Sequence, residues 1–253
     1  MIYGDKLVGN SIENFIKTKG EQKMNAELGN VISFPAKTEK RSRAKRSDGK
    51  VRNIDGVKYF SEKQIKMIRR AVRDQADIDE KKGNITGIKE WMVIDLLTST
   101  GLRVSEAANL RCGDLKIGYP ESKIFVRDGK GHISGNVVIP DSLKKHLKTF
   151  LSWKQQQGEP IGDDDFLFIG QRGNWTSQAI QQIVKKYLRK LGLYERGKSV
   201  HSLRHSYAVE LYSKMKDLRA VQKQLRHVSI QSTIVYADVP DESISNQIKG
   251  LWN

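Results

Sequence analysis

The spacing of apolar residues changes twice along this chain, and these changes restrict the fold that it can adopt. In the second quarter of the sequence apolar residues recur every three or four positions, as Ile65, Ile68 and Val72 do, which predicts amphipathic helices. Two short runs of β type follow at 123–128 and 135–139, and the glycines between them predict a hairpin with a glycine-rich loop. Helical spacing then returns. The pattern predicts an α+β fold, mostly helical, with a small antiparallel sheet on one side.

Capping residues place some of the helix boundaries. Ser61 and Gln64 form the pattern of a capping box, and Phe60 and Ile65 flank it as a hydrophobic staple, so a helix is expected to start at Ser61. Further helices are expected at 88–99, directly after Arg103, and at 141–156, 177–191 (opened by Thr176 and closed by Gly192), 202–214, 218–225 and 229–237.

The chain is strongly basic. Its 45 Lys and Arg residues against 29 Asp and Glu residues give a formal net charge of +16, which favours a polyanionic partner such as nucleic acid. Residues 37–52 hold eight basic and two acidic residues. Such a run predicts a flexible basic arm on DNA phosphates, with a solvated linker as the alternative. The predicted DNA-binding residues are Lys37, Lys40, Arg41, Arg43, Lys45, Arg46, Lys50 and Arg52.

Cysteine usage and hydropathy suggest the cellular setting. Cys112 is the single cysteine, so an intrachain disulfide and a zinc finger are excluded, and its place in NLRCGDL predicts a small packing residue. The sequence has no apolar stretch of about 18 residues and no apolar N-terminal signal segment. We therefore expect a cytoplasmic, nucleoid-associated protein without a membrane partner.

Five residues have the chemistry that attack on a phosphodiester requires. Arg103 lies in TGLRVSEAANL, His201 and Arg204 lie in HSLRHSYAVEL, and Tyr236 follows His227 by nine positions. Guanidinium groups bind two phosphate oxygens in a fork and stay protonated, which suits the charge that develops during attack. The histidines can donate hydrogen bonds to the phosphate, and one can assist proton transfer at the tyrosine. A cationic site would lower the tyrosine pKa from about 10 and favour the phenolate.

Three other tyrosines are candidates for the nucleophile by residue type alone. Tyr187, Tyr207 and Tyr212 all fall at apolar positions of expected helices. Their spacing therefore predicts packing roles, and Tyr236 remains the expected nucleophile.

These residues, in this order, resemble the tyrosine recombinases of the phage integrase family. TGLRVSE, the hairpin DGKG, HSLRH and LRAVQKQLRHVSIQSTIVY carry the resemblance over about 60–240. It implies a mostly helical catalytic domain with a small three-stranded antiparallel sheet, and a site-specific recombinase acting on duplex DNA. The implied catalytic residues are Arg103, Lys130, His201, Arg204, His227 and Tyr236, supported by Glu106 and His205. Glu106 is expected to orient either Arg103 or His205.

The resemblance also implies a mechanism and partners. Tyr236 would form a 3′-phosphotyrosine link and release a 5′-hydroxyl; the covalent bond keeps the energy, so no ATP, metal or other cofactor is expected. Lys130 occupies the place of the general acid of the family, with Lys123 and His132 as alternatives. The implied assembly is a homotetramer on double-stranded DNA with a Holliday-junction intermediate, and an accessory DNA-bending protein is compatible with it.

The chain departs from the family pattern in two places. Most members have glycine before the last histidine, where this chain has Arg226; either the helix end is strained there or the helix ends differently, and Arg226 would add a cation near DNA. Most members also carry a helical core-binding domain that the N-terminal residues here are too few and too polar to form. We expect a basic arm at 1–57, a catalytic domain at 58–240 and a tail at 241–253 that docks on a neighbouring protomer, an organisation similar to that of short members such as the fimbrial-switch invertases.

Three alternative functions follow from the same features. A DNA-binding regulator descended from a recombinase would bind sites without cutting them, and a type IB-like topoisomerase would cut at many sequences. A basic RNA-binding protein is disfavoured because no aromatic-rich strand of RNA-recognition type is present. Loss of covalent cleavage in Tyr236→Phe distinguishes the enzymes from the regulator.

Overall fold

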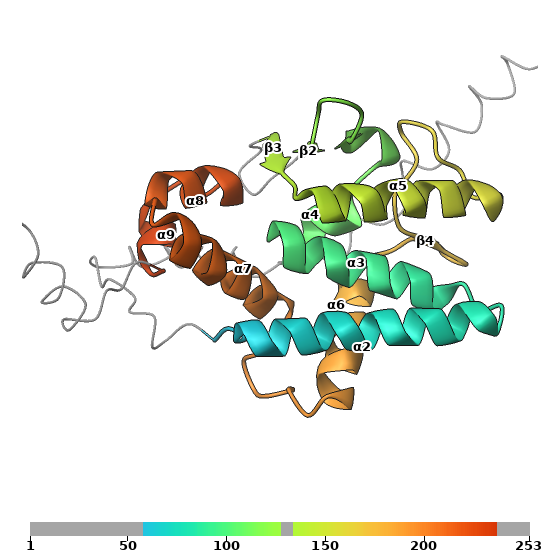
Figure 1. Ribbon diagram of the computed structural model, residues 1–253, viewed down its shortest axis with the longest axis horizontal. Coiled ribbons are helices and arrows are strands. Elements are labelled where there is room, and N and C mark those ends of the chain that lie inside the picture. The colour runs from blue at the N-terminus through green and yellow to red at the C-terminus, as the bar shows by residue number, and fades with distance from the viewer. Residues whose placement is uncertain (1–57, 128–133, 237–253) are drawn as a thin grey trace, which may run out of the picture. The chain divides into compact units, whose positions relative to one another are not determined.

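The computed structural model describes residues 58–127 and 134–236 of the chain. They form a mostly helical unit with a small sheet (Figure 1), which confirms the α+β prediction. The elements are α2 (Glu62–Lys81), α3 (Thr86–Thr100), α4 (Val104–Ala108), η2 (Cys112–Asp114), β1 (Leu115–Lys116), β2 (Lys123–Val126), β3 (Gly135–Val138), α5 (Asp141–Gln156), β4 (Ile169–Gly170), β5 (Gly173–Asn174), α6 (Ser177–Lys190), α7 (Val200–Met215), α8 (Leu218–Leu225) and α9 (Gln231–Ile234).

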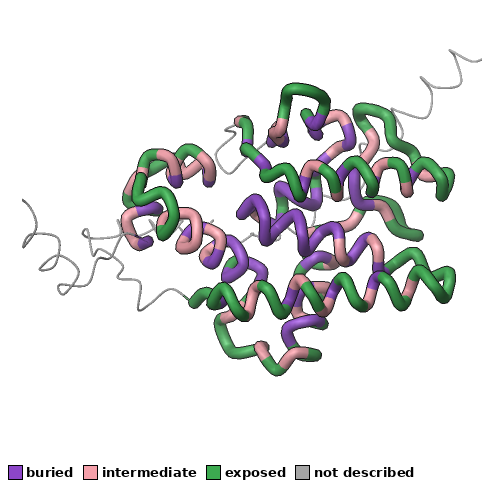
Figure 2. The backbone as a smooth tube through the Cα atoms, viewed as in Figure 1, coloured by how far each residue is buried: buried purple, intermediate pink, exposed green. Residues whose placement is uncertain are grey.

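Helix α3 is the centre of the main core. It packs against α2, α5, α6 and α7, and Figure 2 shows it buried along most of its length. Its apolar residues are buried on all sides rather than along one stripe, which is the pattern of an internal helix. Buried charges on it have partners: Asp95 accepts from Arg69 at 2.5 Å and lies 2.8 Å from His146 Nδ1.

Helix α2 begins where the capping pattern predicts. Ser61 Oγ accepts from the Gln64 backbone N–H at 3.3 Å, and Gln64 Oε1 accepts from the Ser61 N–H at 3.0 Å. Phe60 is buried, and its N–H donates to Ser206 Oγ at 2.7 Å. That bond attaches the start of α2 to α7, the helix that carries most of the candidate site.

The sheet has three antiparallel strands in the order β1-β2-β3. Ile124 pairs with both Leu115 and Val137, and these three side chains are buried against the helical core. The predicted runs at 123–128 and 135–139 become β2 and β3, and the residues between them at 128–133 lie outside the described residues. The short strands β4 and β5 form a separate hairpin that the apolar spacing did not predict.

The last helices differ in length from the predictions. Helix α7 starts at Val200, two residues before the predicted 202, because Ser199 caps it by accepting from the His201 N–H. Helix α9 covers Gln231–Ile234 instead of 229–237. Its first residue follows Ile230, which provides no side-chain cap, and the β-branched residues Thr233, Ile234 and Val235 follow one another, so both features oppose a longer helix.

Candidate active site

The loop that carries Arg103 follows directly from the C-terminus of α3. Gly101 ends the helix in the left-handed conformation, with φ of 63°. A Cβ atom at this position would lie 2.5 Å from Tyr207 Cδ1 and 3.1 Å from Leu225 Cδ2, so only glycine allows α7 and α8 to approach this closely. The turn brings Arg103 to the N-terminus of α4, beside α7 and α8.

Helix α7 presents three candidate residues on one face. His201, Arg204 and His205 are spaced three and four positions apart, which places them on the same side of a helix. His201 is exposed, His205 is half-buried and Arg204 is 7% exposed. The HSLRH pattern therefore places one exposed, one buried and one half-buried side chain on the same helix face.

Arg204 joins the ends of two helices. Its Nη1 donates to the Gly101 carbonyl at 2.5 Å, and its Nη2 donates to the Leu225 carbonyl at 2.6 Å. Helix C-terminal carbonyls carry partial negative charge, so they are suitable partners for a buried guanidinium. Burial lowers the pKa of Arg204 to about 10, and the charge of Arg103 acts in the same direction. The group stays cationic at neutral pH, and within 58–127 and 134–236 two of its five N–H donors have recorded acceptors.

Glu106 holds two arginines. Its carboxylate accepts from the Arg103 backbone N–H and from Arg103 Nη1, each at 2.7 Å. Its Oε2 also lies 2.7 Å from Arg226 Nη2. Burial acts to raise the pKa of Glu106, but the contacts from Arg226 and Arg103 outweigh it and hold the pKa below its ordinary value. Of the two partners expected for Glu106, the structure places Arg103 in contact with it.

Helix α8 ends in a left-handed turn at Arg226. The Arg226 N–H bonds to the Lys223 carbonyl at 3.1 Å, the His227 N–H bonds to the Gln222 carbonyl at 3.0 Å, and φ of Arg226 is 51°. This is the Schellman arrangement in which glycine is usual. The helix therefore ends in the ordinary way, and Arg226 adopts the strained conformation. Its side chain is 6% exposed and points to Glu106, and the suggestion that it adds a cation near DNA stays a prediction.

The turn after α8 places His227 in the same cluster. His227 Nδ1 lies 2.9 Å from Thr233 Oγ1, and Thr233 is fully buried at the start of the segment that leads to Tyr236. Burial and the charges of Arg204 and Arg103 lower the pKa of His227 to about 4. The ring is therefore neutral at neutral pH in the protein without DNA.

Tyr236 packs into a small cluster formed by α7, α8 and the last described residues. Its side chain is 4% exposed and lies among Ala208, Val221 and Leu225. Its hydroxyl lies 2.6 Å from His205 Nδ1. Burial and the charges of His201 and Arg204 lower the pKa of His205, so a neutral ring can accept the phenol proton in this hydrogen bond.

The expected effect of the cationic site on Tyr236 is corrected by the structure. Arg204 acts to lower the pKa of Tyr236, as the sequence predicted, but burial raises it more and the net pKa lies above its ordinary value. The phenol is therefore protonated at neutral pH in the protein without DNA. The Tyr236 hydroxyl therefore needs a proton acceptor before it can act as a nucleophile, and His205 is in contact with it.

The other tyrosines have packing roles, as their spacing predicted. Tyr187 is buried and its hydroxyl donates to Glu90 at 2.8 Å. Tyr207 accepts from Gln224 Nε2 at 3.0 Å, and Tyr212 packs against the cluster around Tyr236. Cys112 is buried in the main core, which confirms its predicted role as a packing residue.

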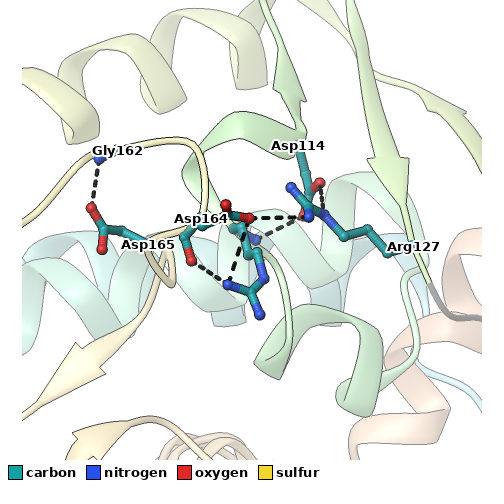
Figure 3. A network of polar contacts seen from close by, with 6 residues as sticks. Asp114, Arg127, Gly162, Asp164 and Asp165 are labelled. Carbon is teal, nitrogen blue, oxygen red and sulfur yellow. Dashed lines mark hydrogen bonds and ion pairs between the residues drawn. The ribbon is translucent and has the colours of Figure 1, made fainter.

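A polar network holds the start of the predicted hairpin loop. Figure 3 shows Arg127, at the end of β2, between Asp114 and Asp164; its Nε donates to Asp114 at 2.6 Å and its Nη1 to Asp164 at 3.2 Å. Ser134 Oγ donates to the Arg127 carbonyl from the other side of the loop. Glu106, Asp114 and Arg127 all line one pocket of about 210 Å³. Lys130 and the alternative His132 lie outside the described residues, whereas Lys123 lies in β2 and pairs with Glu121.

The structure thus brings most of the predicted site residues together. Arg103, Glu106, Arg204, His205, His227 and Tyr236 form one connected cluster, with His201 at its exposed edge. The eight predicted DNA-binding residues at 37–52 lie outside the described residues. The sequence reasoning missed two contacts, from His205 to the tyrosine and from Arg226 to Glu106. The four-residue spacing of His201 and His205 places both on one helix face, and this was a usable signal that His205 faces the site. The contact between Arg226 and Glu106 joins residues far apart in the chain, so no local signal could predict it.

Comparison with known proteins identifies the family of the chain. The sequence model of the phage integrase family matches residues 58–243. The chain belongs to this family. Its curated relatives include the tyrosine recombinase XerC of Herpetosiphon aurantiacus, 33% identical over 157 residues (62% of this chain and 50% of XerC), and XerH of Campylobacter jejuni, 30% identical over 193 residues (75% of this chain and 51% of XerH).

Solved structures share the fold. The crystal structure of XerA recombinase is 25% identical, with a TM-score of 0.59, and the match covers 77% of this chain and 65% of XerA. XerH bound to its difH substrate gives a TM-score of 0.63 at 21% identity, over 80% of this chain and 56% of XerH. The chain spans about half the length of the curated relatives it matches. No helix within 58–127 and 134–236 is long and apolar enough to cross a bilayer.

Proposed function

We propose that the chain is a site-specific DNA recombinase that cleaves and rejoins duplex DNA through a 3′-phosphotyrosine intermediate. The observation that carries the proposal is the placement of the Tyr236 hydroxyl, 2.6 Å from His205 on the helix that also holds Arg204. A phenol, a neutral base and two guanidinium groups in one cluster match the requirements of phosphoryl transfer. The curated relatives are named tyrosine recombinases, and a solved XerH structure holds this fold on a DNA substrate.

The arginines would hold the scissile phosphate. Arg204 has donors that its two carbonyl partners do not use, and Arg103 is the more exposed of the pair, with 19% of its side chain accessible. Attack adds negative charge to the non-bridging oxygens, and fixed guanidinium groups stabilise that charge without reorganising. His201, exposed on the same face of α7, would donate a further hydrogen bond to the phosphate.

A proton transfer accompanies each change of bonding at phosphorus. Tyr236 Oη forms a bond to phosphorus while its proton passes to His205 Nδ1, and the bond from phosphorus to the 5′-oxygen breaks. The leaving 5′-oxygen takes a proton from a general acid, for which Lys130 is the proposed residue. Rejoining reverses these steps with the 5′-hydroxyl of a partner strand, so the phosphodiester energy is conserved and no ATP is consumed.

The finer proposals concern partners and organisation. We propose a basic arm at 1–57, a catalytic domain at 58–240 and a tail at 241–253 through which protomers associate as a homotetramer on DNA, with an accessory DNA-bending protein as a compatible partner. Deleting 241–253 should leave binding to a single site unchanged and reduce assembly, measured by gel shift and analytical ultracentrifugation with DNA. Normal assembly of the truncated chain would contradict the role of the tail.

The test of the function uses covalent trapping. The full chain and Tyr236→Phe are incubated with supercoiled plasmid that carries the DNA flanking the gene, and with fragmented genomic DNA of the source organism, and are quenched in detergent. We expect a protein–DNA adduct with the wild type alone, with breaks at one sequence. Breaks at many sequences would favour a topoisomerase, and sequence-specific binding without any adduct would favour a regulator. The matched control is Tyr212→Phe, because Tyr212 packs beside the cluster and should retain full adduct formation.

A further inference from the structure

Arg226 occupies a position that is unfavourable for its backbone. It is one of two non-glycine residues with positive φ among the described residues, and the other is Lys216, which ends α7 with φ of 54°. Both take the left-handed conformation at a helix end, where side chains other than glycine are strained. Lys216 is exposed, whereas the Arg226 side chain is 6% exposed. The two residues thus share a backbone conformation and differ in their surroundings.

The Arg226 side chain is also poorly satisfied. Its Nε has no acceptor within the described part of the chain, and its Nη2, although 2.7 Å from Glu106 Oε2, is not aligned for a hydrogen bond. Its aliphatic part packs against Gly135 of β3, where an added Cβ would lie 3.0 Å from Arg226 Cδ. Backbone strain and buried N–H groups without an aligned hydrogen bond both oppose stability, although the ion pair with Glu106 offsets part of this cost, and such features are typical of functional sites.

The contact with Glu106 indicates what Arg226 does. Glu106 is nearly inaccessible, and both of its oxygens accept from Arg103. Arg226 approaches the same Oε2 that accepts from the Arg103 backbone. We propose that Arg226 is a positioning residue that keeps the Glu106 carboxylate in contact with Arg103 and so fixes the Arg103 guanidinium for a phosphate. Only the last part of this proposal, that Arg103 is fixed in order to bind a phosphate, rests on the function proposed above.

The charges around Glu106 support this role. Arg103 precedes α4, Arg226 ends α8, and Arg204 of α7 also lies within electrostatic reach. The small pocket beside Glu106 is also lined by Arg111, Asp114 and Arg127, of which Arg127 is paired with Asp114. Without Arg226, Arg103 would be the one close cation left, among the residues that the structure describes, to oppose the effect of burial on the Glu106 pKa. That pKa would rise, and Glu106 would become protonated at a higher pH. A protonated Glu106 holds Arg103 less firmly.

The first experiment needs no DNA. Glu106 is titrated by NMR in chain labelled with ¹³C at the glutamate carboxyl, with the Glu106→Gln variant assigning the signal. In Arg226→Gly the Glu106 pKa should rise by about 1–3 units, the usual effect of one nearby opposite charge. Arg226→Lys, which keeps the charge, should show a smaller rise. Lys216→Gly removes the same kind of strain at an exposed position and should leave the Glu106 pKa unchanged. An unchanged pKa in Arg226→Gly would overturn the proposal.

The second experiment measures cleavage against pH, on the DNA fragment with which the wild type forms an adduct. Arg226→Gly should lose about tenfold or more of the adduct at mildly acidic pH and recover part of it as pH rises, since Glu106 is then ionised. Arg226→Lys should restore most of the loss, and Lys216→Gly should match the wild type. The same pH profile for Arg226→Gly and wild type would refute the positioning role. Absence of an adduct with the wild type would refute the proposed function instead, and the titration would still decide whether Arg226 controls Glu106.

Discussion

Replacing Glu106 by glutamine should lower the free energy of unfolding by about 3 kcal/mol at neutral pH. Removing one partner of a buried ion pair costs about 3–5 kcal/mol, because the remaining charge stays buried without compensation. The Arg226 side chain is 6% exposed, so leaving its charge without a partner carries the full cost. The Arg103 side chain is 19% exposed and can move towards water, which reduces its share of the cost and favours the low end of the range. Glutamine keeps the volume, so no cavity contributes.

The pH dependence of this loss has a defined sign. The pKa of Glu106 in the folded chain lies below its ordinary value of 4.5. Its ionised form therefore contributes stability that is fully present above pH 4.5 and is lost as pH falls through the folded pKa. The difference between wild type and Glu106→Gln should be constant around neutrality and should narrow at pH values below 4.5.

Urea unfolding followed by tryptophan fluorescence measures this difference, and the denaturant slope should be the same in both proteins. Glu62→Gln is the control, because Glu62 pairs with Lys66 on the exposed surface of α2 and its loss should not be measurable. A loss below about 1 kcal/mol for Glu106→Gln, the value of an ordinary surface pair, would refute the reasoning about a buried carboxylate between two arginines.

Other perturbations test the packing, protonation and charge of the chain. Gly101→Ala should cost about 2–4 kcal/mol of unfolding free energy, from left-handed strain and the 2.5 Å approach to Tyr207, whereas Gly83→Ala, with the same strain and open space, should cost about 1 kcal/mol. Proton NMR should find the His227 midpoint near pH 4, and a midpoint near 6.5 would contradict its burial beside Arg204. Deleting 37–52 should flatten the plot of the logarithm of DNA affinity against the logarithm of salt concentration. The slope should fall by about 0.9 for each phosphate that the segment neutralises, and an unchanged slope would make the segment a spacer.

Local rules predicted much of the fold because the residues that decide it are close in sequence. The capping box at Ser61 and the cap at Thr176 are built from partners three positions apart, and both were found where expected. The spacing of His201 and Arg204 likewise defines a helix face without knowledge of the tertiary structure. The bound pair of Arg103 and Glu106 follows the same rule of three positions.

The long-range interactions that complete the site could not be predicted in this way. Arg204 bonds to carbonyls 103 and 21 residues away, and Arg226 reaches a carboxylate in another helix. The pKa of Tyr236 was misjudged for a related reason. The charge of Arg204 could be inferred from the pattern, but the burial that outweighs it depends on how α7, α8 and the residues after α9 pack.

The excess positive charge of the site is unfavourable in the free protein but suits the binding of a phosphodiester, which is the proposed function. Within the described part of the chain, Arg103, Arg204 and Arg226 lie near one carboxylate, that of Glu106, so these residues carry two positive charges in excess while His227 is neutral. Burial, and after it repulsion from the neighbouring arginines, explains why the pKa values of Arg204 and His227 are both lowered. A phosphodiester brings one negative charge and its transition state brings a second, which is the charge that this cluster lacks. Bound DNA should therefore raise both pKa values, and under the proposed function the repulsion in the free protein would favour binding of the transition state.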